Sequence, residues 1–384
     1  MLKDGKKKVL HISHTDISID GRILKELDAL HGSNIYKVVA IGASLNEEAP
    51  PPEKNTKYPV RTLELMTNKT RWRPHIIRYC LAAIELLTRL VVLGVKERPD
   101  VVHCHDTLAL PAAFMIKLFT RCSLVYDAHE LESNKNGQSK LSSKVTLLIE
   151  KMCWSSVDAL ISVSPSILAW YSEKLGEKRD ALILNTPKFE EGLTPQVEKK
   201  PYFHERFPIP DGELVFLYLG MLGTGRGIER LLNVFSSDEI SSHIVFMGYG
   251  PLTSEIVIAG QKSSRVHLHP PVKHDQVVAL TKNADVGMCF IEDVSLSDYL
   301  CLPNKLFEYA FSGLSILASD FPDMRKVIQE YSLGTCSDNN EESILRAVKA
   351  LENNPPIKAA SDLSALSWRA QEVRLLELYE SILV

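Results

Sequence analysis

The chain has 384 residues, of which 45% are hydrophobic and 24% charged, and its formal net charge is −4. This composition is typical of a globular protein with enough apolar residues for two cores, and it offers no general positive field for binding nucleic acid. The seven cysteines are scattered and form no C-x-x-C pair, which argues against a structural zinc or a disulfide framework. The opening residues, MLKDGKKKVLHIS, do not resemble a signal peptide. We therefore expect a protein of the reducing cytoplasm.

The most apolar long segment starts at Ile76 and is interrupted by Arg78, Glu85 and Arg89. A membrane-spanning helix needs about 20 predominantly apolar residues, so the segment is interpreted as a helix packed on a sheet. The basic, amphipathic region Lys69–Arg98 also suggests peripheral contact with the inner face of a membrane. A loop followed by a sheet-covering helix is the plain alternative.

In the first half of the chain, apolar runs typical of strands alternate with periodic runs typical of helices. In the helix expected at 20–30, Ile23, Leu24, Leu27 and Leu30 share one face, and Asp20 is a plausible N-cap. The other helices are expected from about residue 75, through 111–119 and before 154. Strands are expected at 7–13, 36–43, 100–106, 123–130, 158–164 and 181–185.

Periodicity stops between Asn185 and Gly212, a stretch rich in proline and charge that predicts an interdomain linker and a surface loop. The alternation then resumes. Strands are expected at 214–220, 243–250, 265–271, 285–291 and 314–319, and helices at 227–235, near 255, at 275–284, 303–312 and 321–331.

Most expected strands are continuously apolar, as in parallel sheets covered on both faces, so the predicted fold class is α/β. We expect two doubly wound, Rossmann-like domains facing a cleft, at 1–190 and 191–365. A last helix at 366–384 is expected to cross back to the first domain. Ligands bind beyond the carboxyl ends of strands in such sheets, so the strand-to-helix loops are the places to search for a site.

The loop GMLGTGRG follows the strand at 214–220 and opens the next helix. Gly223, Gly225 and Gly227 let the backbone approach a ligand, and Arg226 is a natural partner for phosphate oxygens. The alternative is a flexible turn with a solvated arginine.

The segment PNKLFEYAFSG places Pro303 in the first turn of a helix and Gly313 just past its end. Spacing puts Asn304, Lys305 and Glu308 on one face, which a surface Lys–Glu pair would explain. However, Lys before Glu is the less favourable order, and a Lys in the first turn opposes the helix dipole. A ligand phosphate near Lys305 and a ribose near Glu308 would account for the pattern.

In the first half, His105 ends one strand and His129 another, where imidazoles could orient hydroxyls or phosphate; capping and loop hydrogen bonding are the alternative. No H-x-x-x-H or cysteine cluster supports a metal site, and His103, inside its strand, is predicted to be a core histidine. The loop after the first strand contains Asp16, and with Gly21 and Arg22 it is a candidate to close over an acceptor. No hydrolase motif such as G-x-S-x-G is present.

Taken together, DGRILKEL, DVVHCHD, VYDAHEL, FLYLGMLGTGRGIERLL, VFMGYGP and LPNKLFEYAFSGLSILASD make the whole chain resemble a GT-B glycosyltransferase, similar to the retaining enzymes of family 4. By this resemblance, Glu308 matches the ribose-binding Glu, and Arg226 and Lys305 match donor-diphosphate contacts. His129 and His105 match positions near the transferred sugar, and the donor base would be read by backbone near Val272.

The resemblance implies metal-independent transfer of a sugar from a nucleotide diphosphate donor to a hydroxyl of a sugar, lipid-linked or protein-linked acceptor, with retention of configuration. Surface polysaccharide or glycoconjugate synthesis is the expected setting. Two positions depart from the family: Leu300, where a second Glu is frequent, and Met221, where many relatives carry Arg. A nucleotide-sugar epimerase on the same fold and a non-catalytic nucleotide-sugar-binding scaffold remain as alternatives.

Overall fold

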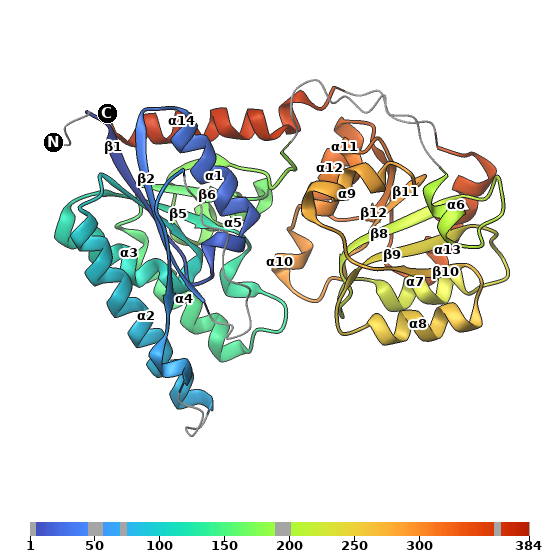
Figure 1. The fold of residues 1–384 in the computed structure, drawn as a ribbon, viewed down its shortest axis with the longest axis horizontal. Coiled ribbons are helices and arrows are strands. Elements are labelled where there is room, and N and C mark those ends of the chain that lie inside the picture. Colours follow the sequence, from blue (N-terminus) through green and yellow to red (C-terminus); the bar gives the residue numbers. More distant parts are fainter. Residues whose placement is uncertain (1–4, 45–56, 70–74, 189–200, 357–361, 384) are drawn as a thin grey trace. The chain divides into compact units, whose positions relative to one another are not determined.

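The computed structural model describes residues 5–44, 57–69, 75–188, 201–356 and 362–383. Two compact units divide the chain: residues 1–183 with 371–384, and residues 184–370 (Figure 1). The first boundary therefore falls earlier than the expected position at 190. Helix α14 (Trp368–Leu383) starts in the second unit and continues into the first.

The first unit contains a sheet whose described strands run parallel in the order β3-β2-β1-β4-β5-β6-β7. The strands are β1 (Lys7–Ile12), β2 (Tyr36–Ser44), β3 (Val60–Glu64), β4 (Val101–His105), β5 (Ser123–Ala128), β6 (Ala159–Ser162) and β7 (Arg179–Leu182). The helices are α1 (Gly21–Gly32), α2 (His75–Glu97), α3 (Asp106–Thr120), α4 (Lys140–Trp154) and α5 (Pro165–Leu175), with short 3-10 turns at Ile17–Ile19, Met66–Lys69 and Glu132–Asn134.

In this unit one helix cap was predicted correctly and one strand was not predicted. Asp20 caps α1, since its Oδ1 accepts hydrogen bonds from the backbone N–H groups of Arg22 and Ile23, each at 3.0 Å. Edge strand β3 was not predicted. Only Leu63 of its five residues is buried, so the strand lacks the continuous apolar run that marks the central strands.

The second unit contains a parallel sheet whose described strands follow the order β10-β9-β8-β11-β12-β13. These strands are β8 (Val215–Met221), β9 (His243–Tyr249), β10 (Val266–His269), β11 (Val286–Cys289), β12 (Ser315–Ser319) and β13 (Gly334–Ser337). The helices are α6 (Tyr202–Arg206), α7 (Ile228–Phe235), α8 (Thr253–Lys262), α9 (His274–Thr281), α10 (Leu296–Tyr299), α11 (Asn304–Phe311), α12 (Pro322–Glu330) and α13 (Glu341–Asn353), followed by a 3-10 turn at Ser364–Leu366.

Both sheets confirm the predicted α/β class, because each has helices flanking parallel strands. In each sheet one central strand, β1 or β8, pairs on one side with the next strand of the chain and on the other side with a later one, β4 or β11. The polar loops that follow these strands thus lie beside those of β4 and β11. Among the described residues, no helix combines the length and the apolar character needed to cross a bilayer.

Candidate functional site

The two histidines predicted in the first unit lie side by side at the ends of β4 and β5. His105 Nδ1 is 3.1 Å from His129 Nε2, which is in turn 3.2 Å from Asp127 Oδ2. Sheet register explains the contact, since His105 and Asp127 are direct partners across β4 and β5 and therefore share one face. His105 is fully buried, whereas His129 is partly exposed. Of the pair, His129 is the one that a substrate can reach.

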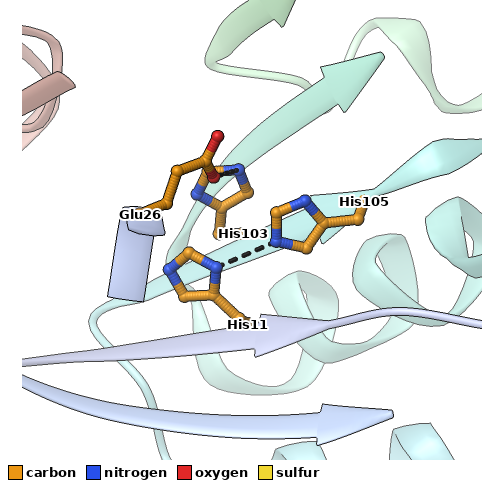
Figure 2. Close-up of side chains that lie close together, drawn as sticks. All are labelled: His11, Glu26, His103 and His105. Atoms are coloured by element: carbon orange, nitrogen blue, oxygen red, sulfur yellow. Dashed lines mark hydrogen bonds and ion pairs between the residues drawn. The ribbon is translucent and has the colours of Figure 1, made fainter. Parts of the chain in front are cut away.

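Further imidazoles extend this group into the interior (Figure 2). His11 is the register partner of His103 across β1 and β4, and its ring stacks on that of His103 at 4.3 Å. His11 Nδ1 also lies 2.9 Å from His105 Nε2. Sequence reasoning missed His11, although its place near the end of a predicted strand matches that of His103 and His105. His103 is fully buried, as expected of a core histidine, and its Nδ1 lies 2.7 Å from the hydroxyl of Tyr379 on α14.

A buried ion pair supports the histidines from the side of α1. Arg22 Nη2 lies 3.0 Å from Asp127 Oδ1, and Arg22 Nε lies 3.2 Å from Glu26 Oε1. Arg22 Nη1 also donates a hydrogen bond to the carbonyl of Ile183 at 2.8 Å. The sequence assigned Arg22 to a loop that closes over the acceptor, but the structure buries its side chain among these partners. Arg22 therefore contacts the framework of the site, not its open side.

The protonation states of these groups follow from their surroundings. Burial opposes a charge on His129, but Asp106 and Asp127 outweigh it and raise the pKa of His129 to about 10. Burial and the nearby His103 hold the pKa of His105 well below its usual range. Burial also opposes the carboxylate of Asp127, yet Arg22 and His129 keep its pKa well below the ordinary value. At neutral pH, His129 is thus an imidazolium that donates hydrogen bonds, and His105 behind it is neutral.

A metal centre is the other chemistry that these side chains suggest. His11, Glu26, His103 and His105 are fully buried and offer ligand atoms within 4.8 Å of one another, a donor set that zinc accepts. However, the rings of His103 and His105 stack with only 19° between their planes, so their lone pairs do not converge on one point. Arg22 already places a positive charge 3.2 Å from Glu26. We interpret the group as a hydrogen-bonded network.

The loop after β1 has its own internal order. Asp16 Oδ1 accepts hydrogen bonds from the backbone N–H and hydroxyl of Ser18, at 3.0 and 2.7 Å, and from the hydroxyl of Thr62 at 3.0 Å. Asp16 is buried and joins this loop to β3. Gly21 is the exposed first residue of α1. These contacts assign Asp16 a structural part in shaping the loop.

In the second unit, the predicted glycine turn connects β8 to α7. Gly225 and Gly227 adopt φ angles of 77° and 71°, which favour glycine. A side chain on Gly227 would also bring its Cβ within 2.9 Å of Phe290 Cβ, just after β11. The backbone N–H of Glu292 donates to the carbonyl of Gly225 at 2.9 Å. Gly223 is buried in the same turn, which therefore packs closely against the end of β11.

Arg226 projects from this turn and is partly exposed, with Nη1 3.6 Å from Asp298 Oδ1. Sequence reasoning did not single out Asp298, a buried residue of α10. The S-x-x-D pattern at 295–298 was a usable signal, because it resembles a helix-capping box. Ser295 Oγ accepts from the Asp298 N–H at 3.1 Å and donates to Asp298 Oδ2 at 2.7 Å. Asp298 is thereby held in place to orient Arg226.

Helix α11 separates the three polar residues that were expected to share a face. Asn304 is exposed and Glu308 is half-buried, but Lys305 is only 9% exposed. The Lys305 ammonium lies 3.9 Å from the centre of the Tyr218 ring and donates to the Phe290 carbonyl at 3.4 Å. This cation–π contact offsets the unfavourable position of the lysine in the first helical turn.

The charged groups of the two segments gather around the end of β11. Burial raises the pKa of the Cys289 thiol to about 12, and the charges of Lys305, Glu308 and Arg226 all act on that thiol. The structure thus brings together the turn and the helix that the sequence proposed as a donor site. Val272, the expected base-reading position, is half-buried in the loop after β10. At the two positions that depart from the family, Met221 is exposed and Leu300 is half-buried.

Comparisons with known proteins concern the fold and the family that the chain resembles. Residues 29–185 match the family model described as Glycosyltransferase Family 4. A curated relative, an uncharacterized glycosyltransferase (MJ1607) of Methanocaldococcus jannaschii, is 25% identical over 268 residues, which are 65% of this chain. The match spans 63% of the relative's own length.

Solved structures match nearly the whole chain. Sucrose-phosphate synthase from Thermosynechococcus elongatus superimposes with a TM-score of 0.76 at 15% identity, covering 98% of this chain and 99% of the other. HepE from Anabaena, in complex with UDP-glucose, gives 0.73 at 12% identity, covering 97% and 99%. The class is therefore the GT-B fold of two Rossmann-like units. Within that class, residues 29–185 are similar to Glycosyltransferase Family 4, the family that the sequence motifs resemble.

The same fold also includes other chemistry. A putative UDP-N-acetylglucosamine 2-epimerase from Listeria monocytogenes superimposes with a TM-score of 0.59 at 15% identity, covering 98% of this chain and 96% of the other. At such identities the likeness concerns the fold alone. The choice between transfer and epimerisation must therefore come from the site and from experiment.

Proposed function

We propose that the protein is a retaining, metal-independent glycosyltransferase of the cytoplasm that moves a sugar from a nucleotide diphosphate donor to a hydroxyl acceptor. The acceptor belongs to a surface polysaccharide or other glycoconjugate. The observation that carries this proposal is the gathering of Arg226, Lys305 and Glu308 around the end of β11, beside the glycine turn that opens α7. The structure of HepE, which is similar in fold, contains UDP-glucose, so UDP-glucose is the first donor to try.

The donor would bind through two kinds of contact in the second unit. The backbone of the turn can approach a diphosphate closely because its glycines carry no side chains, and the N–H groups at the start of α7 favour an anion. Arg226 is partly exposed and supplies a positive charge, while the Lys305 ammonium adds charge beside the Phe290 carbonyl, just after β11. The half-buried carboxylate of Glu308 is suited to accept hydrogen bonds from a ribose diol.

In this proposal, His129 acts as a hydrogen-bond donor. An imidazolium whose pKa is raised to about 10 cannot serve as a base at neutral pH, but it stabilises negative charge on a substrate oxygen. His105 and Asp127 fix its orientation and charge from behind. No protein nucleophile is invoked, because the departing diphosphate itself takes the proton of the acceptor hydroxyl as the new glycosidic bond forms.

The test begins with a thermal-shift screen of nucleotide sugars, followed by turnover with and without candidate acceptors. A transferase releases the nucleoside diphosphate only when an acceptor is present, and NMR of the product shows the donor's anomeric configuration retained. Nucleotide release or sugar isomerisation without any acceptor would identify an epimerase. Binding without turnover on a broad acceptor panel would favour the scaffold. Stabilisation by no nucleotide sugar would overturn the donor-site assignment.

A further inference from the structure

The outward side of α2 carries apolar side chains where a water-facing helix usually carries polar ones. Ile77, Ile84 and Val92 are each about half exposed or more, with exposed fractions of 48%, 61% and 62%. Leu86 and Leu90 are buried on the opposite side of the helix. These exposed residues therefore lie away from the core and contribute nothing to its packing.

Helix α4 shows the same feature more clearly. Four apolar side chains recur along one stripe at spacings of four, three and four residues, with exposed fractions between 47% and 73%: Leu141, Val145, Leu148 and Met152. The residues of α4 that are buried, Glu150, Cys153 and Trp154, belong to the other side of the helix. The stripe is continuous along three turns, so it is a surface and not a set of isolated exposed residues.

Helix α3 connects these two surfaces. It packs against both α2 and α4 and covers β4 and β5. Its last turns expose Leu118 and Phe119, at 61% and 62%. The three helices thus form one layer over the sheet of the first unit, and we call its outward side the α2–α4 face.

The charges on the α2–α4 face have a single sign. Lysines 96, 140, 144 and 151 are exposed on α2 and α4. All four carboxylates in the three helices are turned inward or paired. Glu85 accepts from the backbone of Met66 and Thr67, Glu97 pairs with Lys8, Asp106 is buried, and Glu150 accepts from Tyr126 and Tyr171. This segregation occurs in a chain whose net charge is −4.

We propose that the α2–α4 face binds the surface of an anionic lipid bilayer. Apolar side chains flanked by lysines enter the boundary between headgroups and acyl chains, while the ammonium groups contact anionic headgroups. A symmetric dimer through this face is disfavoured, because a second copy would place the same lysines against each other. The surface extends the predicted Lys69–Arg98 contact to α3 and α4; residues 70–74 of that segment lie outside the described residues.

Co-sedimentation of the full chain with vesicles tests the proposal. Vesicles of phosphatidylcholine alone are compared with an equal mixture of phosphatidylcholine and phosphatidylglycerol. We expect binding to the mixture that weakens as salt is added, and much weaker binding to phosphatidylcholine. Equal binding to both vesicles, or none to either, would overturn the proposal. A concentration-dependent dimer abolished by the variants below would overturn it in favour of self-association.

Two pairs of variants localise the binding. Lys144→Glu with Lys151→Glu should weaken binding to the anionic vesicles by at least about 25-fold, since each lysine contributes about one factor of five near such a surface and each new carboxylate is repelled by it. Leu148→Ser with Met152→Ser should weaken it by at least about 10-fold through lost apolar contact. All four side chains are exposed, so folding should be unchanged.

Matched controls come from the second unit. Lys262→Glu with Lys326→Glu reverses two exposed lysines, and Val257→Ser with Ile258→Ser removes two apolar side chains of α8 that are 44% and 50% exposed. These variants should bind vesicles like the parent protein. Equal losses of vesicle binding in the control variants and in the α4 variants would show that the α2–α4 face is not the binding surface. The readout requires no donor or acceptor, so it is independent of the proposed transferase activity.

Discussion

Both units have charged side chains after their parallel strands, but the two sets of charges differ in how deeply they are buried. In the first unit, Arg22 and Asp127 are buried and neutralise each other at 3.0 Å. In the second, Arg226 is partly exposed and its contact with Asp298 is longer, at 3.6 Å. A charge held by buried partners stabilises a framework, whereas a partly exposed charge can exchange its partner for a ligand.

The same distinction separates neighbouring residues within each unit. His105 is buried and neutral, and His129, three ångströms away, is charged and reachable. Lys305 is held by the Tyr218 ring, and Glu308 one turn later is half-buried. Burial thus divides residues of similar chemistry into those that support a site and those that can contact a substrate. Four experiments test this difference between buried and exposed charges.

The largest effect is expected for Arg22→Met. It leaves the buried carboxylate of Asp127 without its main partner, which should cost about 3–5 kcal/mol of unfolding free energy. Arg226→Met is the matched control and should cost less than about 1 kcal/mol, because its ion pair is partly exposed. Urea unfolding measures the change in unfolding free energy for both variants. Hydrogen exchange of the backbone amides in β4 and β5 shows whether the first unit is the part destabilised. Equal losses would remove the distinction between the two arginines.

The next largest effect concerns ligand binding. Glu308→Ala and Arg226→Ala should each weaken donor binding and turnover by 10-fold or more, since each removes a charged hydrogen bond of about 1.5–3 kcal/mol. Calorimetric titration with the donor found in the screen provides the measurement. Glu330→Ala and Lys326→Ala, both exposed on α12, serve as controls. Affinity that is unchanged in the site variants would exclude these residues from the donor site.

The pH dependence of stability tests the buried network. Asp106 and Asp127 overcome the burial of His129 and raise its pKa from 6.5 to about 10, so its stabilisation is complete below pH 6.5 and disappears as pH rises through 10. Burial and Asp127 raise the pKa of Glu26 from 4.5 to about 8, so stability also falls across that range. Each proton contributes a slope of at most about 1.4 kcal/mol per pH unit.

Urea unfolding at a series of pH values should therefore show the free energy of unfolding decreasing from pH 7 to pH 10. His129→Gln should flatten the part of the curve above pH 8, and Glu26→Gln the part below it. A wild-type curve that rises across this range, or one that neither variant alters, would contradict the assigned protonation states.

The smallest effect is expected in the glycine turn. Gly227→Ala places a side chain at φ 71° and a Cβ 2.9 Å from that of Phe290, which should cost about 1–2 kcal/mol of stability and weaken donor binding. Gly223→Ala is the control, because its Cβ would lie 3.7 Å from the flexible side chain of Met221. It should cost less than about 0.5 kcal/mol. Thermal unfolding compares the two, and a reversed order would show that the turn rearranges.

Local sequence patterns were sufficient to predict the fold class and most of the helices and strands. Continuous apolar runs identify the central strands because parallel sheets are covered on both faces, and local chemistry marks helix ends such as Asp20 before α1 and Gly313 after α11. Edge strand β3 was not predicted, because an edge strand buries few side chains and therefore lacks a continuous apolar run. The glycine turn and the polar residues of α11 were also identified, since the types and spacing of residues are local properties.

The contacts of each polar residue, in contrast, depend on how the elements pack together. Register across β1, β4 and β5 brings His11, His103, His105 and Asp127 together, although His11 lies 94 residues before His105 in the chain. Packing places the Lys305 ammonium over the Tyr218 ring and buries Arg22, although the sequence allowed an open position for both side chains. Helical and strand periods specify which side of an element a residue occupies, but burial and partners depend on what packs against that side.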